Sequence, residues 1–504
     1  MNERASDRSS ATPSDRFEGD LPRMHATDAA AIVEDGETVA VSGFGGVGYP
    51  KSVPPRLADR TSLTIVSAGG VGGEIDETLV ESGAMERRAH FQTRRTIRSA
   101  INAGEISFFD RHVSSFGDEV RFGRGLSVDV AIIEAVAVGE DWLVPSTSIG
   151  HAAAFVAAAD RLIVEVNRAQ PLELAKVHDI YERDPPPERE PIPLSGPIDR
   201  IGDDRIRFES NELVAVVESD QPDDPYTFRE PTDVDRQIGD HLGSFLATEF
   251  ASNPLLEETV VLQFGVGSMG NALMGALSSL EFGDRDVVYF GEVVQDGLLD
   301  MLESGRLTGA SATSLALSRD GQRRLFRSID EFAEDIVLRP AAISNNPALI
   351  DRFGVVGVNS AVEVDCYGNA NATHVGGTRM VNGIGGGLDF SRNSHLSIIA
   401  LPSTAADGDI SRIVPMTPHV DHVEHDVAVV VTEHGVADLR GTSPRERSQK
   451  LVSVADPSFR DALESYLERA AEGGGHTVHD LDTAFDWHVN WGPEVRDDDA
   501  SRGP

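Results

Sequence analysis

Apolar and polar residues form alternating blocks along the chain, and these blocks predict strands separated by helices. Near-continuous apolar runs at residues 128–134 and 161–166 are typical of parallel strands that are buried on both faces. A helical stretch at residues 152–159 separates these two runs. The pattern predicts an α/β fold with open, mostly parallel sheets covered by helices.

Residues 259–300 carry the clearest succession of predicted elements. In chain order they predict a strand at 259–264, a glycine loop with Gly265, Gly267 and Gly270, a small-residue helix at 271–280, and a strand at 286–290. Glu292 follows the second strand directly. Because ligands of open α/β sheets bind outside the carboxyl ends of the strands, we expect the loop and the carboxylate at one edge of a sheet.

The first half of the chain shows a similar succession. It predicts a strand at 38–42, a glycine loop at 43–48, a helix at 54–60 and a strand at 62–68. A proline-rich stretch at 184–197 is unsuited to regular structure, because proline lacks an amide donor. We expect two similar α/β domains, at 25–225 and 226–492, between an acidic lead at 1–24 and a polar tail at 493–504.

Composition narrows the classes of function. The 504 residues include 83 acidic and 44 basic ones, for a net charge of −39, which opposes binding to nucleic acid or to anionic membranes. Such acidity is typical of a surface adapted to high salt. The single cysteine, Cys366, excludes a disulfide within the chain and favours a reducing compartment. With no long apolar stretch and no apolar signal core, we expect a cytoplasmic protein.

One interpretation of the glycine loop is a dinucleotide site. Gly265, Gly267 and Gly270 open a predicted helix after a strand, and Glu292 ends the next strand. This spacing matches a dinucleotide fingerprint with its ribose-binding acid, as in an NAD-dependent dehydrogenase. Two further glycine loops, at 43–48 and 383–387, need another explanation under this interpretation.

A second interpretation is a metal site at His419, His422 and His425, which lie close to Asp421 and Asp426. A spacing of three residues on a strand or loop does not turn all three rings the same way. Ligand types without the right geometry are a weak signal. We therefore expect these histidines to be structural, and no metal.

A third interpretation is acyl transfer through a carboxylate nucleophile. A glutamate such as Glu292 can attack a thioester and divide one difficult step into two easier ones. The reaction needs backbone N–H donors for the oxyanion and a cradle for a phosphate-rich carrier, both of which glycine loops provide. A regulator that binds coenzyme A (CoA) without turnover is the non-enzymatic alternative.

Several segments carry a resemblance to a known family. They are GFGGVGYPKSVP, LQFGVGSMGNAL, GEVVQDGLLDML, ISNNPALI, NGIGGGLDFSRN, HVDHVEHDV and VTEHGVADLRG, spread over residues 25–470 in family order. The sequence resembles the acetyl-CoA hydrolase/transferase family, a class I CoA-transferase group. The resemblance implies two similar open α/β domains with the active site between them, and it makes the dehydrogenase a distant alternative.

The resemblance also implies roles for individual residues. It makes Glu292 the nucleophile, which forms a glutamyl-CoA thioester in a ping-pong cycle, and it places Asn345 and Glu433 among the active-site polar residues. The implied CoA-binding residues are Gly267, Ser268, Met269, Gly270, Asn271, Asn382 and Gly386. The backbone N–H of Gly386 is also the implied oxyanion donor.

The resemblance implies CoA as a co-substrate with no permanently bound cofactor, an acyl-CoA and a small carboxylic acid as substrates, and a homodimer. It leaves open whether the enzyme transfers CoA or hydrolyses acetyl-CoA, and which acids it uses. One position departs from the family: where a lysine often stands to meet a CoA phosphate, this chain has Ala406, followed by Asp407.

Overall fold

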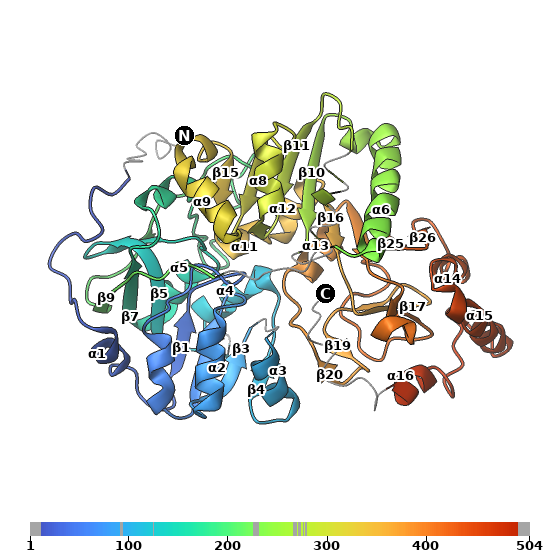
Figure 1. The fold of residues 1–504 in the computed structure, drawn as a ribbon, viewed down its shortest axis with the longest axis horizontal. Coiled ribbons are helices and arrows are strands. Elements are labelled where there is room, and N and C mark those ends of the chain that lie inside the picture. The colour runs from blue at the N-terminus through green and yellow to red at the C-terminus, as the bar shows by residue number, and fades with distance from the viewer. Residues whose placement is uncertain are drawn as a thin grey trace. The chain divides into compact units, whose positions relative to one another are not determined.

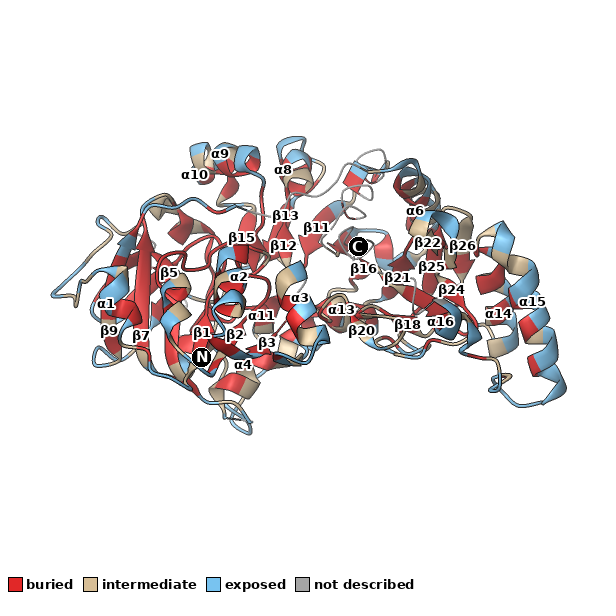
Figure 2. Cartoon of the chain, turned by 60° about the horizontal axis from the view of Figure 1, so that its bottom comes forward, coloured by how far each residue is buried: buried red, intermediate tan, exposed pale blue. Residues whose placement is uncertain are grey.

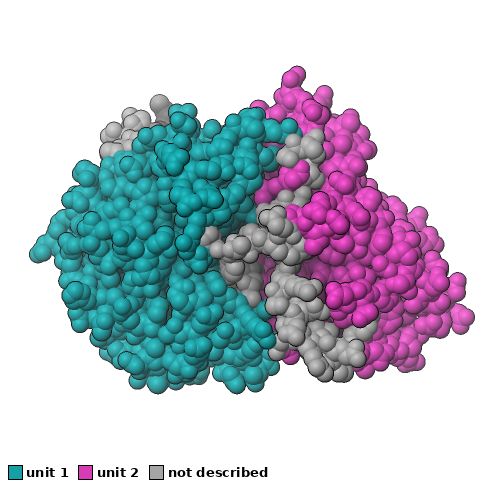
Figure 3. Space-filling view, in the orientation of Figure 1, with its two compact units in different colours: residues 1–227, 288–349 teal, residues 228–287, 350–504 magenta. Residues whose placement is uncertain are grey.

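The chain folds into two α/β units. The computed structural model describes residues 12–90, 94–123, 125–224, 231–265, 270, 274–275, 277 and 280–491 (Figure 1). Contacts between Cα atoms assign Met1–Thr227 and Val288–Leu349 to unit 1, and Phe228–Val287 and Ile350–Pro504 to unit 2 (Figure 3). The first segment ends close to the predicted boundary at residue 225. The segment with Glu292, which the sequence analysis placed in the second domain, belongs to unit 1.

The larger sheet of unit 1 is mostly parallel, as predicted. Its seven parallel strands run in the order β4-β3-β2-β1-β5-β7-β9. Their bounds are β1 (Thr38–Val41), β2 (Leu63–Ser67), β3 (Met85–Ala89), β4 (Ser107–Phe109), β5 (Val128–Val138), β7 (Ala159–Asn167) and β9 (Leu213–Ser219). Antiparallel strands β6 (Trp142–Pro145) and β8 (Ile206–Arg207) continue from the end of β5.

Helices cover this sheet. They are α1 (Ala26–Ala30), α2 (Gly73–Glu81), α3 (Arg95–Asn102), α4 (Val113–Arg121), α5 (Ala152–Ala158) and the 3-10 helices η1 (Pro54–Asp59) and η2 (Leu172–Val177). The helix predicted at 54–60 is thus a 3-10 helix, which begins with two prolines that lack amide donors. Between residues 69 and 127 lie α2, α3, α4, β3 and β4, none of which was predicted from the sequence.

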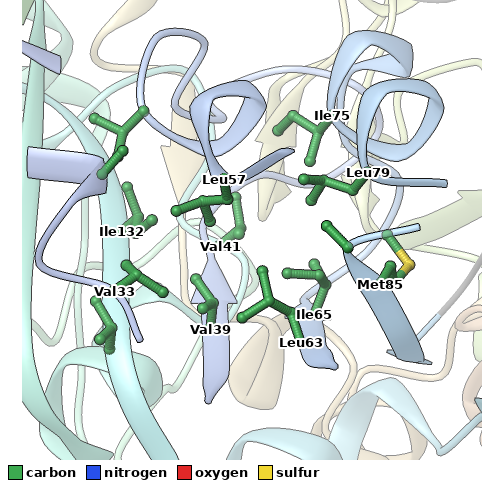
Figure 4. Close-up of a cluster of buried hydrophobic side chains, with 14 of the residues drawn as sticks. Val33, Val39, Val41, Leu57, Leu63, Ile65, Ile75, Leu79, Met85 and Ile132 are labelled. Carbon is green, nitrogen blue, oxygen red and sulfur yellow. The ribbon is translucent and has the colours of Figure 1, made fainter. Parts of the chain in front are cut away.

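The core of unit 1 follows from the period of two in its strands. Val39 and Val41 of β1 point to the same face, where Ile65 of β2, Leu57 and Leu79 pack against them (Figure 4). All five side chains are buried, and each stabilises the fold by about 1.5–3 kcal/mol relative to an exposed position. The buried apolar runs therefore fix the strands whose carboxyl ends carry the loops described below.

The second segment of unit 1 contains parallel strands in the order β15-β13-β11, which belong to an eight-stranded sheet. The strands are β11 (Asp286–Phe290), β13 (Gly309–Ala312) and β15 (Ile336–Leu338), and β12 (Val293–Val294) pairs with β14 (Ser314–Leu315). The helices are α8 (Asp296–Glu303), α9 (Arg319–Arg327), α10 (Ile329–Phe332), α11 (Ala341–Ser344) and α12 (Pro347–Arg352). Bridges from Ser148 to Ser314 and from His178 to Leu338 join this segment to the first one.

Unit 2 contains the parallel strands β10 (Thr259–Phe264), β16 (Val356–Asn359), β21 (Leu396–Ala400) and β25 (Val429–Thr432), with antiparallel β26 (Gly435–Asp438) at the edge. These strands are largely buried (Figure 2). The α/β prediction is confirmed in both units.

The other elements of unit 2 surround this sheet. The strands are β17 (Glu363–Asp365), β18 (Ala370–Asn371), β19 (His374–Val375), β20 (Arg379–Met380), β22 (Thr404–Ala405), β23 (Ile410–Ser411) and β24 (Ile413–Val414). The helices are α6 (Asp233–Ser252), α13 (Gly387–Asn393), α14 (Pro444–Ser453), α15 (Pro457–Glu472), α16 (Asp486–Trp491), and the 3-10 helices η3 (Pro254–Leu256) and η4 (Ala406–Gly408). Among the described helices, none has the length and apolar character needed to cross a membrane.

Arg339 joins the two segments of unit 1 immediately before α11. Its fully buried guanidinium pairs with Asp179 and donates to the Ser311 hydroxyl at 2.8 Å. Asp179 also accepts the backbone N–H groups of Ile201 and Gly202, each at 2.7 Å. The buried ion pair is therefore completed by hydrogen bonds from several elements, and it fixes the start of α11.

Replacement of Arg339 is expected to destabilise the fold strongly. Arg339→Met leaves the Asp179 carboxylate buried without its cation, which we expect to lower the free energy of unfolding by about 3–5 kcal/mol. The control is Lys176→Met, which removes a partly exposed pair with Asp330 and should cost less than about 1 kcal/mol. Urea denaturation measures both values, and equal losses in the two variants would contradict this role.

Candidate active site

Glu292 is held by its backbone at the end of a strand. It lies between β11 and β12, and its carbonyl oxygen accepts the N–H groups of Thr313 at 2.9 Å and Ser314 at 3.1 Å. Its side chain is half-buried. The backbone bonds fix the direction in which the carboxylate leaves the strand, at the edge where α/β sheets bind ligands.

Asn345 forms a hydrogen bond with the Glu292 carboxylate. The family resemblance implies that both residues belong to the active site. The Asn345 side-chain Nδ2 donates to Glu292 Oε1 at 2.9 Å, and its own oxygen accepts the Ser344 hydroxyl at 2.9 Å. Because a carboxylate accepts hydrogen bonds, the N–H end of the amide faces Glu292 and its oxygen end faces the Ser344 hydroxyl. Asn345 is fully buried directly after α11. Its amide therefore orients one carboxylate oxygen of Glu292.

The first glycine loop, residues 43–48, lies against the same strand end. The Ser314 hydroxyl donates to the Phe44 carbonyl at 2.6 Å. Gly45 has a φ of +68°, and a Cβ there would lie 3.7 Å from Val293 Cγ2. The glycine thus lets the loop backbone reach the residue after Glu292 in a conformation that other residues rarely adopt.

A further glycine-rich loop, residues 69–73, packs on the first one and was missed by the sequence analysis. The Gly46 N–H donates to the Gly70 carbonyl at 2.9 Å. A Cβ on Gly69 would lie 3.0 Å from the Phe44 ring. Four glycines in the five residues after a buried strand were the signal that could have found it.

Tyr289 lies beneath the residue that precedes Glu292. A Cβ on Gly291 would come within 2.4 Å of the Tyr289 hydroxyl, so glycine is required at this position. Burial, with the charge of Glu292 as a second cause, raises the pKa of Tyr289 well above its usual range. The phenol is therefore neutral beside Glu292 at physiological pH.

Glu433, in unit 2, is also fixed by hydrogen bonds. Its carboxylate accepts the Ser403 N–H at 2.8 Å and the Ser403 hydroxyl at 2.6 Å. Its carbonyl oxygen accepts His241 Nε2 at 3.2 Å. Ser403 is buried and was not singled out from the sequence. The two donors hold Glu433 as an oriented acceptor.

Most of the CoA-binding loop inferred from the resemblance lies outside the described residues, namely Gly267, Ser268, Met269 and Asn271. Gly270 is described, and it is helical and buried. Just before this loop, Gln263 and Asn359 exchange two side-chain hydrogen bonds, each of 3.2 Å.

The Gln263–Asn359 pair links two glycine loops within unit 2. Cβ atoms on Gly265 and Gly387 would lie 3.5 and 3.6 Å from Asn359 Oδ1. The end of strand β10 and the start of helix α13 are thus built around one buried amide pair, which the sequence analysis did not identify.

Gly386 and Asn382 lie in the third glycine loop. Gly386 is buried and directly precedes α13. The Asn382 N–H donates to the Thr373 carbonyl at 3.3 Å. Gly386 therefore lies at the start of α13, whereas Asn382 lies earlier in the loop and is held there by Thr373.

The segment that departs from the family has an unusual backbone. Ala406 and Asp407 have φ angles of 51° and 55°, in the left-handed region that residues other than glycine seldom adopt. They form η4 between β22 and β23. No residue here carries the positive charge of the family's lysine.

The three histidines proposed as alternative ligands do not converge. His422 is buried, and its backbone pairs with Ala370. The side chain of His425 is 82% exposed, whereas His419 lies 3.2 Å from Asp421. Throughout the described ranges, no group of three histidine, cysteine, aspartate or glutamate residues is arranged to hold a metal.

Comparison with protein families gives two matches. The model of the acetyl-CoA hydrolase/transferase N-terminal domain matches residues 12–218, and that of the C-terminal domain matches residues 321–467. Together they cover most of the chain.

Curated relatives match almost the full length. The chain is 42% identical to the succinyl-CoA:acetate CoA-transferase of Clostridium kluyveri, over 92% of this chain and 88% of the relative. It is 39% identical to the propanoyl-CoA:succinate CoA transferase of Escherichia coli, over 93% and 97%. It is 38% identical to the acetyl-CoA hydrolase of Kluyveromyces lactis, over 91% and 92%.

Solved structures share the fold. RipA from Yersinia pestis matches with a TM-score of 0.69 and 21% identity, over 89% of this chain and 97% of RipA. The 4-hydroxybutyrate CoA-transferase of Porphyromonas gingivalis matches with a TM-score of 0.58 and 22% identity, over 90% and 97%. At these identities the likeness supports the α/β fold.

Metal removal is expected to have no effect on this protein. Dialysis against EDTA should leave the melting temperature unchanged, because no group of three ligand side chains in the described part of the chain is arranged to hold a metal. Calorimetry before and after dialysis, with metal analysis of the protein, tests this. A melting temperature that falls with EDTA and recovers with zinc would contradict it.

Proposed function

Because the chain belongs to the acetyl-CoA hydrolase/transferase family, we propose that it is a CoA-transferase acting between an acyl-CoA and a small carboxylate. Acetyl-CoA or succinyl-CoA is the proposed donor and acetate the proposed acceptor. These substrates follow from the names of the relatives. The observation in this chain that supports the proposal is the Glu292 carboxylate. It accepts a hydrogen bond from Asn345 at 2.9 Å, and the glycine loop at residues 43–48 lies against the same strand end.

The proposed reaction uses Glu292 as the nucleophile. Its carboxylate oxygen attacks the thioester carbonyl of the acyl-CoA, the C–S bond breaks, and an acyl-glutamyl anhydride and CoA thiolate form. The thiolate then attacks the side-chain carboxyl carbon of Glu292 in the anhydride. The free acid departs, and the enzyme carries a glutamyl-CoA thioester. An incoming carboxylate then reverses these two steps.

The residues named from the family resemblance have distinct proposed roles. Asn345 holds the attacking carboxylate, and Glu433 is the proposed acceptor for donor groups of CoA. The Gly386 N–H is the proposed oxyanion donor, since backbone donors in place before the reaction stabilise charge that develops in the transition state. CoA contacts are proposed for Gly267 to Asn271, Asn382 and Gly386, with CoA as a co-substrate and no resident cofactor.

Hydrolysis of acetyl-CoA is the second proposed activity of the same site. If water reaches the anhydride or the thioester, the products are free acid and free CoA. The acetyl-CoA hydrolase among the relatives supports this alternative. Transfer and hydrolysis differ in how well water is excluded, so the ratio of acyl-CoA to free CoA produced with acetate present distinguishes them.

Other expectations stay predictions. A homodimer and a cytoplasmic location rest on the resemblance and on the single cysteine. Function at high salt rests on the net charge of −39, whose internal repulsion salt screens.

Trapping of the thioester tests the mechanism. Borohydride added together with an acyl-CoA should inactivate the enzyme and change the mass of the peptide that contains Glu292, because it reduces a glutamyl thioester. Borohydride without acyl-CoA should do neither. Glu292→Gln should abolish transfer and keep CoA binding, whereas Glu303→Gln, at an exposed carboxylate on α8, should retain activity. Trapping on another peptide would refute the proposal.

The Asn345 contact is expected to act on turnover. Asn345→Ala removes the donor to Glu292 Oε1, and we expect kcat to fall by about 100-fold, because small misplacements of reacting groups cost this much. CoA binding, measured by calorimetry, should stay within about twofold, since Asn345 is expected to act only after binding. The control is Asn393→Ala, which removes a bond to the Asp389 carbonyl. A kcat equal to that of the wild type would contradict the role.

A further inference from the structure

A buried lysine lies beneath the first glycine loop. The chain has only three lysines, Lys51, Lys176 and Lys450. The side chain of Lys51 is 2% exposed, whereas that of Lys176 is 35% exposed. Burial of an ammonium group is costly unless it is paired and fully hydrogen-bonded.

The Lys51 ammonium group has three acceptors for its three N–H donors. Nζ lies 2.5 Å from Glu134 Oε2, 2.8 Å from Asp223 Oδ1 and 2.8 Å from the Tyr49 carbonyl. Both carboxylates are fully buried. The match of three donors to three oxygens suits lysine rather than the planar, larger guanidinium group of arginine.

The two carboxylates of this cluster accept further hydrogen bonds. Glu134 accepts the Ser146 hydroxyl at 2.6 Å and Asn167 Nδ2 at 3.0 Å. Asp223 accepts the Thr147 hydroxyl at 2.6 Å and Gln170 Nε2 at 3.0 Å. The donors come from β7 and from the loop segments that follow β6 and β7, so the cluster joins several elements of unit 1.

Hydrogen bonds and short backbone segments together connect Lys51 to Glu292. Asp223 Oδ1, the partner of Lys51, also accepts the Gly48 N–H at 3.2 Å, at one end of the glycine loop. Within the loop, the Phe44 carbonyl accepts the Ser314 hydroxyl, and the Ser314 N–H donates to the Glu292 carbonyl. Residues 43–48 are thus held at one end by Asp223 and at the other by the segment that fixes Glu292.

We propose that Lys51, together with Asp223, is a positioning residue of the transfer reaction, holding loop 43–48 against Ser314 and so fixing the backbone of Glu292. This inference rests on the proposed function of Glu292. Lys51 touches no substrate in this account. Its ammonium group holds Asp223, the acceptor for the Gly48 N–H, in place at 2.8 Å, and it pairs with Glu134 at the same time.

The electrostatics of the cluster agree with this role. Burial raises the pKa of Glu134 to about 7, although Lys51 opposes the rise. The charge of Asp223 also raises the pKa of Glu134, so the lysine offsets the repulsion between two buried carboxylates. Buried ion pairs contribute little net stability compared with apolar packing, so the geometry they impose is the better account of this cluster.

A double-mutant cycle on two separate links tests the proposal. Asp223→Ala removes the acceptor at one end of the loop and leaves Lys51 paired with Glu134, and Ser314→Ala removes the hydroxyl at the other end while its backbone bonds remain. Each is expected to lower kcat by about 10- to 100-fold, because the nucleophile is less well placed. The KM for acyl-CoA should change by no more than about twofold.

The double variant decides between one connected path and two separate defects. If both links act through loop 43–48, the double variant should be about as slow as the slower single variant. Losses that multiply would overturn the proposal, and so would a wild-type kcat in either single variant. Should Asp223→Ala not fold, Ser314→Ala decides alone, with an unchanged kcat as the refuting result.

Two controls complete the experiment. Lys176→Met removes a lysine outside the cluster and should keep the wild-type kcat. Lys51→Arg keeps the positive charge but does not fit the three acceptors, so loop 43–48 should be held less well and kcat should fall. Full activity in this variant would overturn the role of the lysine. If the wild-type protein transfers no CoA, the proposed function fails, whereas an active wild type with unaffected variants refutes this inference alone.

Discussion

Two hydrogen bonds to the backbone carbonyl of Glu292 fix the position of this residue, the candidate nucleophile. The Glu292 carbonyl accepts from Thr313 and Ser314, and this pairing joins the end of β11 to the start of β14. Ser314 also reaches the first glycine loop through its hydroxyl group. The carboxylate therefore projects from a backbone that cannot rotate freely, which is the condition for a nucleophile to meet an acyl group in one geometry.

Buried charge supports this arrangement at two places in unit 1. Arg339 pairs with Asp179 just before α11, which leads to Asn345, and Lys51 pairs with Glu134 and Asp223 beneath loop 43–48. The N–H groups of both side chains donate to acceptors that come from several elements. The chain has 44 basic residues against 83 acidic ones, and these two basic side chains hold buried geometry instead of lying on the solvated surface.

The sequence allowed the strands and the key carboxylate to be predicted, but not the contacts between distant segments. Strands 259–264 and 286–290 agree with the structure because their apolar runs have sharp ends. The assignment of roles to Glu292 and Asn345 came from family resemblance, since their separation in sequence implies no contact. The Ser314–Phe44 bond joins residues 270 positions apart, and the buried position of Lys51 depends on tertiary packing, so neither could be predicted from local pattern.

Transfer of an oxygen atom into Glu292 is the most direct test of the central claim that this carboxylate is the nucleophile. In the proposed cycle, the incoming carboxylate becomes part of an anhydride, and attack of CoA on its acyl carbon leaves one of its oxygen atoms on Glu292. Turnover with a carboxylate labelled with heavy oxygen, followed by mass spectrometry of the peptides, should show heavy oxygen on Glu292. Turnover that leaves Glu292 unlabelled would contradict the account.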